Sequence, residues 1–312
     1  MQKSYCKCVV WYKACSLDNI IMAIVLLLGS KGWIGGKLLS ILQTVSGVST
    51  VIESAVRADD VDSLKTELDI LNPTHVISAI GRTHGVIGDE VIPTIDYLEY
   101  PGKLVENVRD NLFSPVVIAK LCSDRNIHFT YLGTGCIFEY TDDLKEFDEN
   151  AKPNFFGSGY SIVKGFTDQL MSLYSDNVLN VRIRMPITAE SNPRDFITKI
   201  VKYERICSIS NSMTVLDELL PIMVDMALKK RTGTINLTNP GTISHEEILE
   251  MYKEVVDPSK TWTLMSYEEQ SALLKSKRSN NELDTSKLLS WYPNVPHIRD
   301  AVRSALEKRA LL

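Results

Sequence analysis

The stretch Ile24-Val-Leu-Leu-Leu-Gly-Ser-Lys-Gly-Trp-Ile-Gly35 decides the fold class of this chain. Its first five residues form an unbroken apolar run, which is typical of a parallel strand buried on both faces. Gly29, Gly32 and Gly35 follow, and residues 36–43 have the pattern of a helix. The stretch therefore predicts a strand, a glycine turn and a helix, which is the first unit of a doubly wound α/β fold.

The alternation of strands and helices continues along the chain. We expect further strands at 48–53, 74–80, 128–132 and 180–184, and helices at 61–71, 103–125 and 158–174. Residues 22–185 are thus predicted to form a Rossmann-like dinucleotide-binding domain with a doubly wound parallel sheet. Beyond it the pattern is less regular, and we interpret residues 186–312 as a smaller C-terminal substrate-binding lobe, interleaved with the sheet. Helices are expected there at 194–202, 215–229 and 245–255.

Composition excludes several classes of protein. The chain has 312 residues, of which 44% are hydrophobic, so it can bury a large core. Its net charge of -5 disfavours nucleic-acid binding, which needs a basic face. The six cysteines form no doubled C-x-x-C pattern, so we expect neither a metal site nor a disulfide framework. A reducing, cytoplasmic location is the expectation.

The N-terminal region gives no sign of a membrane anchor. The longest apolar run covers residues 20–28, whereas a helix needs roughly 20 apolar residues to span a bilayer. Residues 1–21 hold three cysteines and lack periodicity. We interpret them as an extension outside the fold, either disordered or an upstream start that the fold does not use.

The glycine turn predicts a dinucleotide cofactor. Glycines allow the backbone to approach a pyrophosphate, whose charge is stabilised by the N-terminus of the following helix. Arg57 follows the second expected strand and could pair with a 2'-phosphate, which favours NADPH; a surface arginine without this role is the alternative. The predicted cofactor contacts along the turn are Gly29, Lys31, Gly32, Trp33, Ile34 and Gly35.

Tyr160 and Lys164 lie four residues apart and therefore share one face of the predicted helix. A nearby ammonium lowers the pKa of a phenol, which then exchanges a proton with a carbonyl oxygen near neutral pH. A solvated pair on a helix surface is the alternative interpretation.

Together with the glycine turn, Thr134 at a strand end and Asn111 on the preceding helix, this pair resembles the extended short-chain dehydrogenase/reductase family. The resemblance implies that Tyr160 is the general acid/base and that Lys164 holds the nicotinamide ribose. Thr134 is then expected to bind the substrate oxygen, and Asn111 to support the lysine.

Cys136 narrows the resemblance. Nucleotide-sugar dehydratases of this family carry an Asp-Glu pair after the threonine, and this chain has none. It is more similar to the 3,5-epimerase/4-reductases of plant-type UDP-rhamnose synthesis. The strings that carry this similarity are GWIGG (32–36), TGCIFEY (134–140), KPNFFGS (152–158), RMPI (184–187), NPR with FITKI (192–200), NSMTVLDELLP (211–221) and SNNELD (279–284).

This resemblance implies one site for two reactions. A ketone at C4 acidifies the protons on C3 and C5, so a base and an acid on opposite faces of the ring can invert each carbon. Cys136 is expected to be the base and Lys199 the acid, although which residue is the base at each carbon stays open. A small buried cysteine and a solvated lysine are the alternatives.

The substrate implied is UDP-4-keto-6-deoxy-D-glucose. After epimerisation, NADPH would deliver a hydride to C4 while Tyr160 protonates the oxygen, giving UDP-β-L-rhamnose. Arginine forks suit a diphosphate, while asparagines suit the sugar or the base. The residues expected in these roles are Arg184, Arg194, Arg278, Asn154, Asn211 and Asn280. For Arg184 a structural role is an equal alternative, and we interpret His84 as an ordinary loop histidine.

The sequence is also compatible with two other functions. One is a 4-ketoreductase without epimerase activity, and the other is a non-catalytic regulatory subunit that binds NADP. The resemblance also implies that a separate UDP-glucose 4,6-dehydratase supplies the substrate. A homodimer is considered because helices beside the active site often pair subunits in this superfamily.

Overall fold

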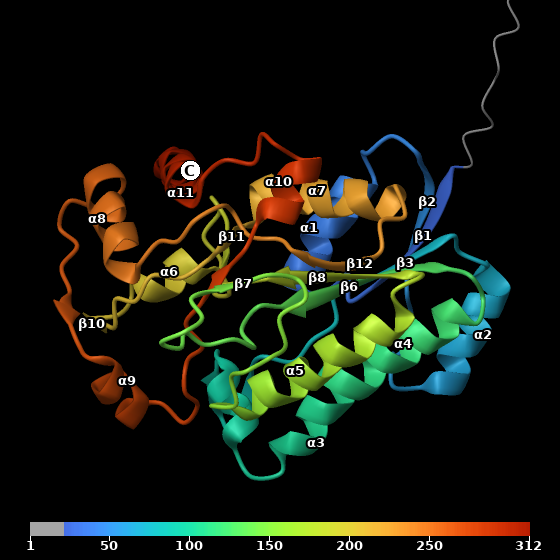
Figure 1. Ribbon diagram of the computed structural model, residues 1–312, viewed down its shortest axis with the longest axis horizontal. Coiled ribbons are helices and arrows are strands. Elements are labelled where there is room, and N and C mark those ends of the chain that lie inside the picture. The colour runs from blue at the N-terminus through green and yellow to red at the C-terminus, as the bar shows by residue number, and fades with distance from the viewer. Residues whose placement is uncertain (1–21) are drawn as a thin grey trace, which may run out of the picture.

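A six-stranded parallel sheet forms the centre of the molecule (Figure 1). The computed structural model describes residues 22–312; the predicted extension at 1–21 lies outside the described residues. Across the sheet the strand order is β12-β8-β6-β3-β1-β2. The bounds of these strands are β1 Ala23–Leu28, β2 Val48–Glu53, β3 His75–Ser78, β6 His128–Thr134, β8 Val178–Ile183 and β12 Gly233–Asn236.

Both faces of the sheet are covered by helices, as the apolar run of β1 predicts. Val25 and Leu27 face one core with α1, α7 and α10, whereas Leu26 and Leu28 face the other core with α2, α4 and α5. This alternation is the two-residue period of a strand buried on both sides. The helices are α1 Trp33–Leu42, α2 Val61–Leu71, α4 Ser114–Ser123, α5 Gly159–Met171, α7 Leu216–Leu228 and α10 Ser286–Trp291.

The strand order fixes where a ligand can bind. The winding of the chain reverses between β1 and β3, and doubly wound sheets bind ligands in the crevice outside the carboxyl ends of their strands at such a reversal. The glycine turn after β1 lies at this point, against the end of β3: a Cβ on Gly29 would be 3.1 Å from the backbone of Ala79.

The region after residue 185 contributes to both parts of the molecule. β12 joins the sheet beside β8, and α7 packs on α1. The remainder forms the lobe seen at the left of Figure 1, around a third core of its own. Its main elements are β9 Pro186–Ile187, α6 Phe196–Ile200, β10 Arg205–Ile206, β11 Thr214–Val215, α8 His245–Val255, β13 Thr263–Leu264, α9 Tyr267–Leu273 and α11 Ile298–Ala310.

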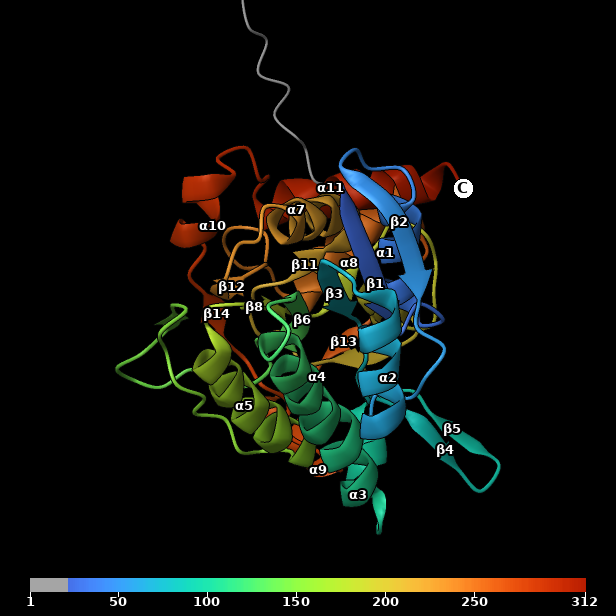
Figure 2. The ribbon, with the colours of Figure 1, turned by 90° about the vertical axis from the view of Figure 1, so that its right-hand side faces the viewer.

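Several elements were not predicted from the sequence, among them β12, α9, α10 and α11. A hairpin of β4 (Gly85–Ile87) and β5 (Glu90–Ile92) projects from the body of the molecule (Figure 2). The expected helix at 103–125 is divided into α3 (Lys103–Val108), a π-helical turn (Arg109–Phe113) and α4. A π turn inserts one extra residue, and such turns are frequent at functional sites.

Smaller elements complete the description. They are the 3₁₀ turns Ile95–Glu99 and Ser172–Tyr174 and the short pairing of β7 (Glu146–Phe147) with β14 (Glu282–Leu283). Among residues 22–312, every helix is either too short or too polar to traverse a lipid bilayer.

Candidate active site

A cavity of about 990 Å³ lies at the carboxyl ends of β1, β3 and β6, and the lobe forms its other wall. Such a volume is typical of a site for ligands as large as a cofactor together with a substrate. Among its lining residues are many of the predicted site residues: Gly32, Trp33, Ile34, Gly35, Asn111, Thr134, Cys136, Tyr160, Lys164, Arg184, Arg194, Lys199, Arg278 and Asn280.

The glycine turn has the geometry of a pyrophosphate cradle. Gly29 has a φ of +83°, which an L side chain rarely adopts. A Cβ on Gly35 would lie 2.0 Å from the carbonyl oxygen of Gly29, so only glycine fits there. Gly32 is the N-cap of α1 and leaves the first N–H groups of that helix directed at the cavity edge. Lys31 lines a smaller adjoining hollow. The turn therefore fits a dinucleotide.

Two residues near the end of β2 bear on the choice of cofactor. Arg57 is 63% exposed in its side chain and pairs with Asp59 at 2.8 Å. It is thus free to exchange this surface partner for a phosphate. Glu53 ends β2, about 20 residues after the glycine turn, where a carboxylate can accept a hydrogen bond from a ribose 2'-hydroxyl. Glu53 was not predicted as a site residue, although its spacing from the glycine turn is a recognisable signal.

Helix α5 carries Tyr160 and Lys164 into the cavity wall. The Ser158 hydroxyl caps the helix by accepting from the backbone N–H of Ser161 at 3.1 Å. Burial raises the pKa of the Tyr160 phenol above its usual range, a charge on Cys136 adds to this effect, and a hydrogen bond with Thr134 opposes it. The expected lowering of this pKa by Lys164 is therefore not found, because desolvation dominates.

Lys164 is buried, and burial lowers its pKa to about 7, against the opposing charges of Asp168 and Cys136. Its ammonium donates to the hydroxyl of Tyr131 and to the carbonyl oxygen of Leu132, the latter at 3.3 Å. Lys164 therefore titrates near neutral pH within a pocket of oxygen acceptors.

Asn111 lies in the π turn and has other partners than the predicted one. Its amide oxygen accepts from the N–H of Arg82, and its amide nitrogen donates to the carbonyl of Arg82 and to Asn107, all at 2.8–2.9 Å. Its carbonyl accepts from the Thr167 hydroxyl at 2.6 Å. None of these described contacts reaches Lys164, so Asn111 holds the loop after β3 instead.

Thr134 ends β6, and Cys136 follows in the turn. The Thr134 hydroxyl accepts from the N–H of Cys136 at 3.0 Å, and the carbonyl of Cys136 accepts from Ser161 at 2.7 Å. These two bonds fix the turn against α5. The half-buried Cys136 side chain packs in a small apolar cluster with Tyr97 and Tyr160 at the cavity wall. The cysteine is thus held beside the tyrosine rather than in the main core.

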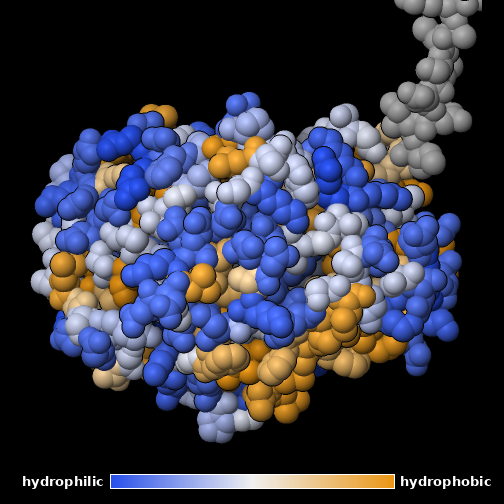
Figure 3. All heavy atoms as spheres, viewed as in Figure 1, coloured by the Kyte–Doolittle hydropathy of each residue, from blue (hydrophilic) through white to orange (hydrophobic). Residues whose placement is uncertain are grey.

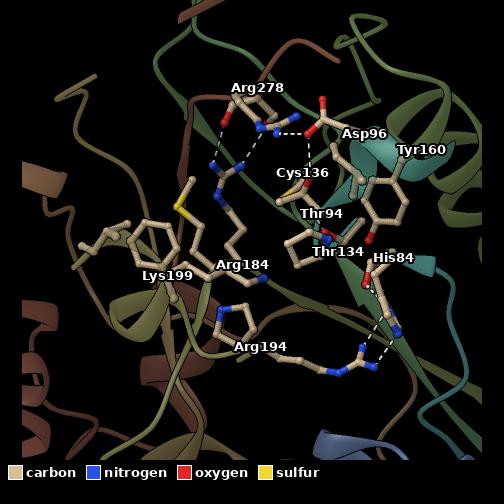
Figure 4. Close-up of a pocket in the computed structure, with 18 of the residues that line it drawn as sticks. His84, Thr94, Asp96, Thr134, Cys136, Tyr160, Arg184, Arg194, Lys199 and Arg278 are labelled. Atoms are coloured by element: carbon tan, nitrogen blue, oxygen red, sulfur yellow. Dashed lines mark hydrogen bonds and ion pairs between the residues drawn. The ribbon is translucent and has the colours of Figure 1, made fainter. Parts of the chain in front are cut away.

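Lys199 enters the cavity from the opposite wall, on α6 (Figure 4). The buried carboxylate of Asp195 caps this helix by accepting from the N–H of Thr198 at 2.7 Å, and it pairs with Arg309 at 2.6 Å. Burial lowers the pKa of Lys199, and the positive charge of Arg194 lowers it further. A lysine with a lowered pKa gives up its proton more readily.

Arg194 faces His84 across the cavity mouth (Figure 4). Its two terminal guanidinium nitrogens lie 2.9 and 2.5 Å from the two ring nitrogens of His84. A neutral imidazole has one nitrogen that can accept a hydrogen bond. Burial and the charges of Arg194, Arg82 and Lys199 lower the pKa of His84 to about 4, so the ring is neutral at pH 7. His84 is therefore part of the cavity wall, not an ordinary loop histidine.

Arg278 is positioned by Asp96, which was not predicted as a site residue. The two side chains pair at 2.5 Å, and Asp96 also accepts from the N–H of Ser276 and from Thr94. Burial raises the pKa of Asp96, but the hydrogen bonds of Arg278 and Thr94 outweigh it and bring the pKa down to about 2. No local sequence pattern signals a pair so distant along the chain.

Three predicted substrate residues have structural contacts. All five N–H groups of the buried Arg184 donate to oxygens of the chain, at Gly135, Asn211, Ser212 and Ser279. This favours the structural alternative, because no donor is left for a phosphate. Asn154 is bonded through its amide to the backbone of Glu139, and neither it nor the buried Asn211 lines the cavity.

Comparison with known proteins agrees with this geometry. No family model matches the chain. The chain is 54% identical over 287 residues to protein L780 of Acanthamoeba polyphaga mimivirus, covering 91% of this chain and 97% of that protein. It is 40% identical over 283 residues to the bifunctional dTDP-4-dehydrorhamnose 3,5-epimerase/dTDP-4-dehydrorhamnose reductase of Arabidopsis thaliana, covering 89% and 90% of the two chains.

Solved structures give the same result. The crystal structure of the L780 UDP-rhamnose synthase matches with a TM-score of 0.87 over 92% of this chain and 99% of that chain, at 54% identity. The dTDP-4-dehydrorhamnose reductase of Bacillus anthracis in complex with NADP matches with a TM-score of 0.73 over 90% and 98%, and at 14% identity it supports the fold alone. The chain therefore belongs to the rhamnose-forming nucleotide-sugar 3,5-epimerase/4-reductases, and it is an enzyme of the extended short-chain dehydrogenase/reductase class.

Proposed function

We propose that this enzyme epimerises UDP-4-keto-6-deoxy-D-glucose at C3 and C5 and reduces the product at C4 with NADPH, giving UDP-β-L-rhamnose. The observation that carries this proposal is the presence of Cys136, Lys199 and the Tyr160/Lys164 pair around one cavity. The printed functions of the viral and plant relatives agree with it.

The cofactor would be held by the glycine turn and by Lys164. The close approach of Gly29 and Gly35, together with the free N–H groups at the start of α1, suits a pyrophosphate. Arg57 is the proposed partner of a 2'-phosphate. When bound, the nicotinamide supplies the hydride that reduces C4.

Epimerisation needs a base and an acid on the two faces of the sugar ring. In the proposed mechanism the Cys136 thiolate removes the proton from the carbon next to the ketone, and the ketone oxygen becomes an enolate oxygen. Lys199 then gives a proton to the opposite face of the same carbon, which inverts it. Cys136 is left as a thiol and Lys199 as an amine, and both recover their starting states by exchange with water.

Thr134 and Tyr160 would stabilise the charge on the C4 oxygen in both reactions. Preorganised hydrogen-bond donors in a buried site stabilise an oxyanion strongly. Tyr160 suits the reduction because its raised pKa keeps the phenol protonated until the C4 oxygen becomes an alkoxide. The phenol then transfers its proton to that oxygen.

The UDP diphosphate would be bound by cationic side chains of the lobe. Arg194 and Arg278 line the cavity, and each keeps at least one N–H without a partner among the described residues. Asn280 also lines the cavity and can contact polar groups of the sugar or the base. A 4,6-dehydratase reaction must supply the 4-keto substrate.

The test is incubation with UDP-4-keto-6-deoxy-D-glucose and NADPH in D2O, followed by proton NMR of the sugar. We expect UDP-β-L-rhamnose with deuterium at C3 and C5 and hydrogen from the cofactor at C4. A simple 4-ketoreductase would leave C3 and C5 unlabelled and would reduce only an already epimerised sugar. If the enzyme consumes no NADPH with the unepimerised or with the epimerised 4-keto sugar, both enzymatic functions are contradicted.

We also propose that two copies associate through α3 and α5. The exposed apolar side chains here include Val105, Leu104 and Phe166, with exposed fractions of 71%, 60% and 55%. Figure 3 shows apolar surface over the lower part of the molecule, where Figure 1 places α3 and α5. A second copy is the proposed occupant because two such apolar helix faces are self-complementary around a twofold axis. Val105→Glu with Phe166→Glu should convert a dimer to a monomer in sedimentation; a monomeric wild-type protein would contradict the proposal.

A further inference from the structure

Lys164 is held by an acceptor that the Tyr160/Lys164 motif does not include. Its ammonium donates to the hydroxyl of Tyr131 and to the carbonyl of Leu132. Asn111 was predicted to support the lysine. Its side chain is instead hydrogen-bonded to Arg82 and Asn107. The support of the lysine therefore comes from strand β6.

Tyr131 is suited to hold a side chain in place. It is 1% exposed, and its ring packs in the core against Phe129, with ring centroids 6.4 Å apart. Its hydroxyl accepts from the Lys164 ammonium, and the Lys164 Nζ also lies 4.5 Å from the centre of the Tyr131 ring. A buried phenol oxygen normally has a hydrogen-bond partner, and a ring fixed by core packing cannot move away from that partner.

The charged groups around Lys164 do not replace this acceptor. Asp168 on the same helix raises the lysine pKa, but its carboxylate is occupied by Arg182 at 2.7 Å and by Asn180 at 2.7 Å. Cys136 also raises the lysine pKa through its charge, yet no described hydrogen bond joins it to Lys164. Tyr160 is the remaining titratable neighbour on the helix.

We propose that Tyr131 is a positioning residue: its phenol oxygen fixes the Lys164 ammonium at the cofactor side of the cavity and favours the protonated form of that lysine. This inference rests on the proposed function for the role of Lys164 in the reaction. A hydrogen bond from an ammonium to a phenol is stronger than one between an uncharged amine and a phenol. Loss of the phenol should therefore lower the pKa of Lys164.

The direct test uses Tyr131→Phe and needs no substrate or cofactor. In protein labelled with ¹⁵N-lysine, the Lys164 signal is assigned from its loss in Lys164→Met and is followed through a pH titration. We expect its pKa to fall by about one unit in Tyr131→Phe, the size of one charge-assisted hydrogen bond. Tyr174→Phe is the matched control, because Tyr174 packs against the same core and none of its described contacts involves Lys164.

The catalytic test is the pH profile of the reduction. The alkaline limb of kcat should move to lower pH by the same amount in Tyr131→Phe, and the rate at pH 6 should return to within about threefold of the wild-type rate. Tyr131→Met should behave in the same way, which guards against a packing defect of one variant. A merely structural role would lower the rate equally at all pH values.

Two results would overturn the inference. One is a Lys164 pKa that is the same in the wild type and in both Tyr131 variants. The other is a loss of rate that low pH does not restore. If the wild-type enzyme reduces no 4-keto sugar at all, the proposed function fails, whereas the NMR titration still decides whether Tyr131 sets the protonation of Lys164.

Discussion

The proposed epimerisation depends on two single side chains, Cys136 and Lys199. The cysteine follows the end of β6, and the lysine lies on α6 in the lobe, yet both line one cavity. Cys136 belongs to a small cluster with Tyr160 instead of the main core, and the pKa of Lys199 is lowered by burial and by Arg194. These are the environments expected of groups that transfer protons.

The first prediction concerns this pair. Cys136→Ala and Lys199→Met should each slow solvent deuterium exchange at C3 and C5 by at least about 100-fold, the usual contribution of a positioned acid or base. Binding of NADPH, measured by fluorescence, should stay within about twofold of the wild type. Exchange at the wild-type rate in both variants would remove them from the mechanism.

A matched cysteine controls for the loss of a thiol. Cys207 also lines the cavity, but it belongs to the lobe, where it directly follows β10. Cys207→Ala should exchange deuterium as the wild type does. Slow exchange in this variant would mean that changes in cavity packing, and not the chemistry of Cys136, explain the first result.

The second prediction concerns the choice between NADPH and NADH. Arg57→Ala should weaken NADPH binding about tenfold, which corresponds to about 1.4 kcal/mol, and should leave NADH binding unchanged. The physical reason is the loss of a guanidinium that can pair with the 2'-phosphate. Titration with both cofactors measures the difference. Equal effects on the two cofactors would mean that Arg57 does not recognise the 2'-phosphate.

At the scale of elements, the glycine turn is defined by one close contact. A Cβ on Gly35 would lie 2.0 Å from the carbonyl oxygen of Gly29, so Gly35→Ala must displace the backbone of the turn. We expect this variant to bind NADPH at least about tenfold more weakly and to lose about 1–3 kcal/mol of unfolding free energy. Cofactor titration and urea unfolding measure the two effects.

The neighbouring glycine provides the control. A Cβ on Gly36 would meet its nearest neighbour, the carbonyl oxygen of Ser30, at an ordinary 3.6 Å. Gly36→Ala should therefore keep cofactor affinity and add about 0.5–1 kcal/mol of stability, because alanine favours the helix. Equal loss of binding in both variants would show that the close contact at Gly35 is not what matters.

At the scale of the whole molecule, two histidines make stability depend on pH. His75 and His128 face each other on β3 and β6, and both are buried, with one ring nitrogen each lacking a partner among the described residues. Burial, then the charges of His128 and Lys230, lower the pKa of His75 to about 4. Burial also lowers the pKa of His128. Both rings are therefore neutral in the folded protein at pH 7.

These groups should destabilise the fold as the pH falls. In the unfolded chain His75 takes up a proton near pH 6.5, whereas in the folded protein it does so only near pH 4, so the stability that its neutral form contributes above pH 6.5 is lost between about pH 6.5 and pH 4. The lowered pKa of His128 acts in the same direction. The expected slope from His75 over this range is about 1.4 kcal/mol per pH unit. Urea unfolding of His75→Gln should show a clearly smaller slope over this range than the wild type.

The exposed His297 is the comparison for this effect. His297→Gln should keep the wild-type slope. A wild-type slope in His75→Gln would mean that His75 takes up its proton equally well in the folded protein.

The sequence determined the elements whose pattern is local. The apolar run of β1, the glycine turn and the α2 range 61–71 were predicted because strand burial, turn geometry and helix periodicity are properties of neighbouring residues. Tyr160 and Lys164 could be found for the same reason, since one helix turn separates them. Similarity of long strings then indicated the family and pointed to Cys136 and Lys199.

Only the tertiary structure decided which side chains hold these groups and with what charge. Several contacts of the site join segments that are distant in the sequence. They include the contacts of Asn111 in the π turn, the pairing of Asp96 with Arg278, the hydrogen bonds that occupy the Arg184 guanidinium, and the contact of Tyr131 with Lys164. The raised pKa of Tyr160 likewise comes from burial, which exists only once the segments are packed. Hydrogen-bond partners and desolvation depend on this packing, and no local pattern of residues encodes them.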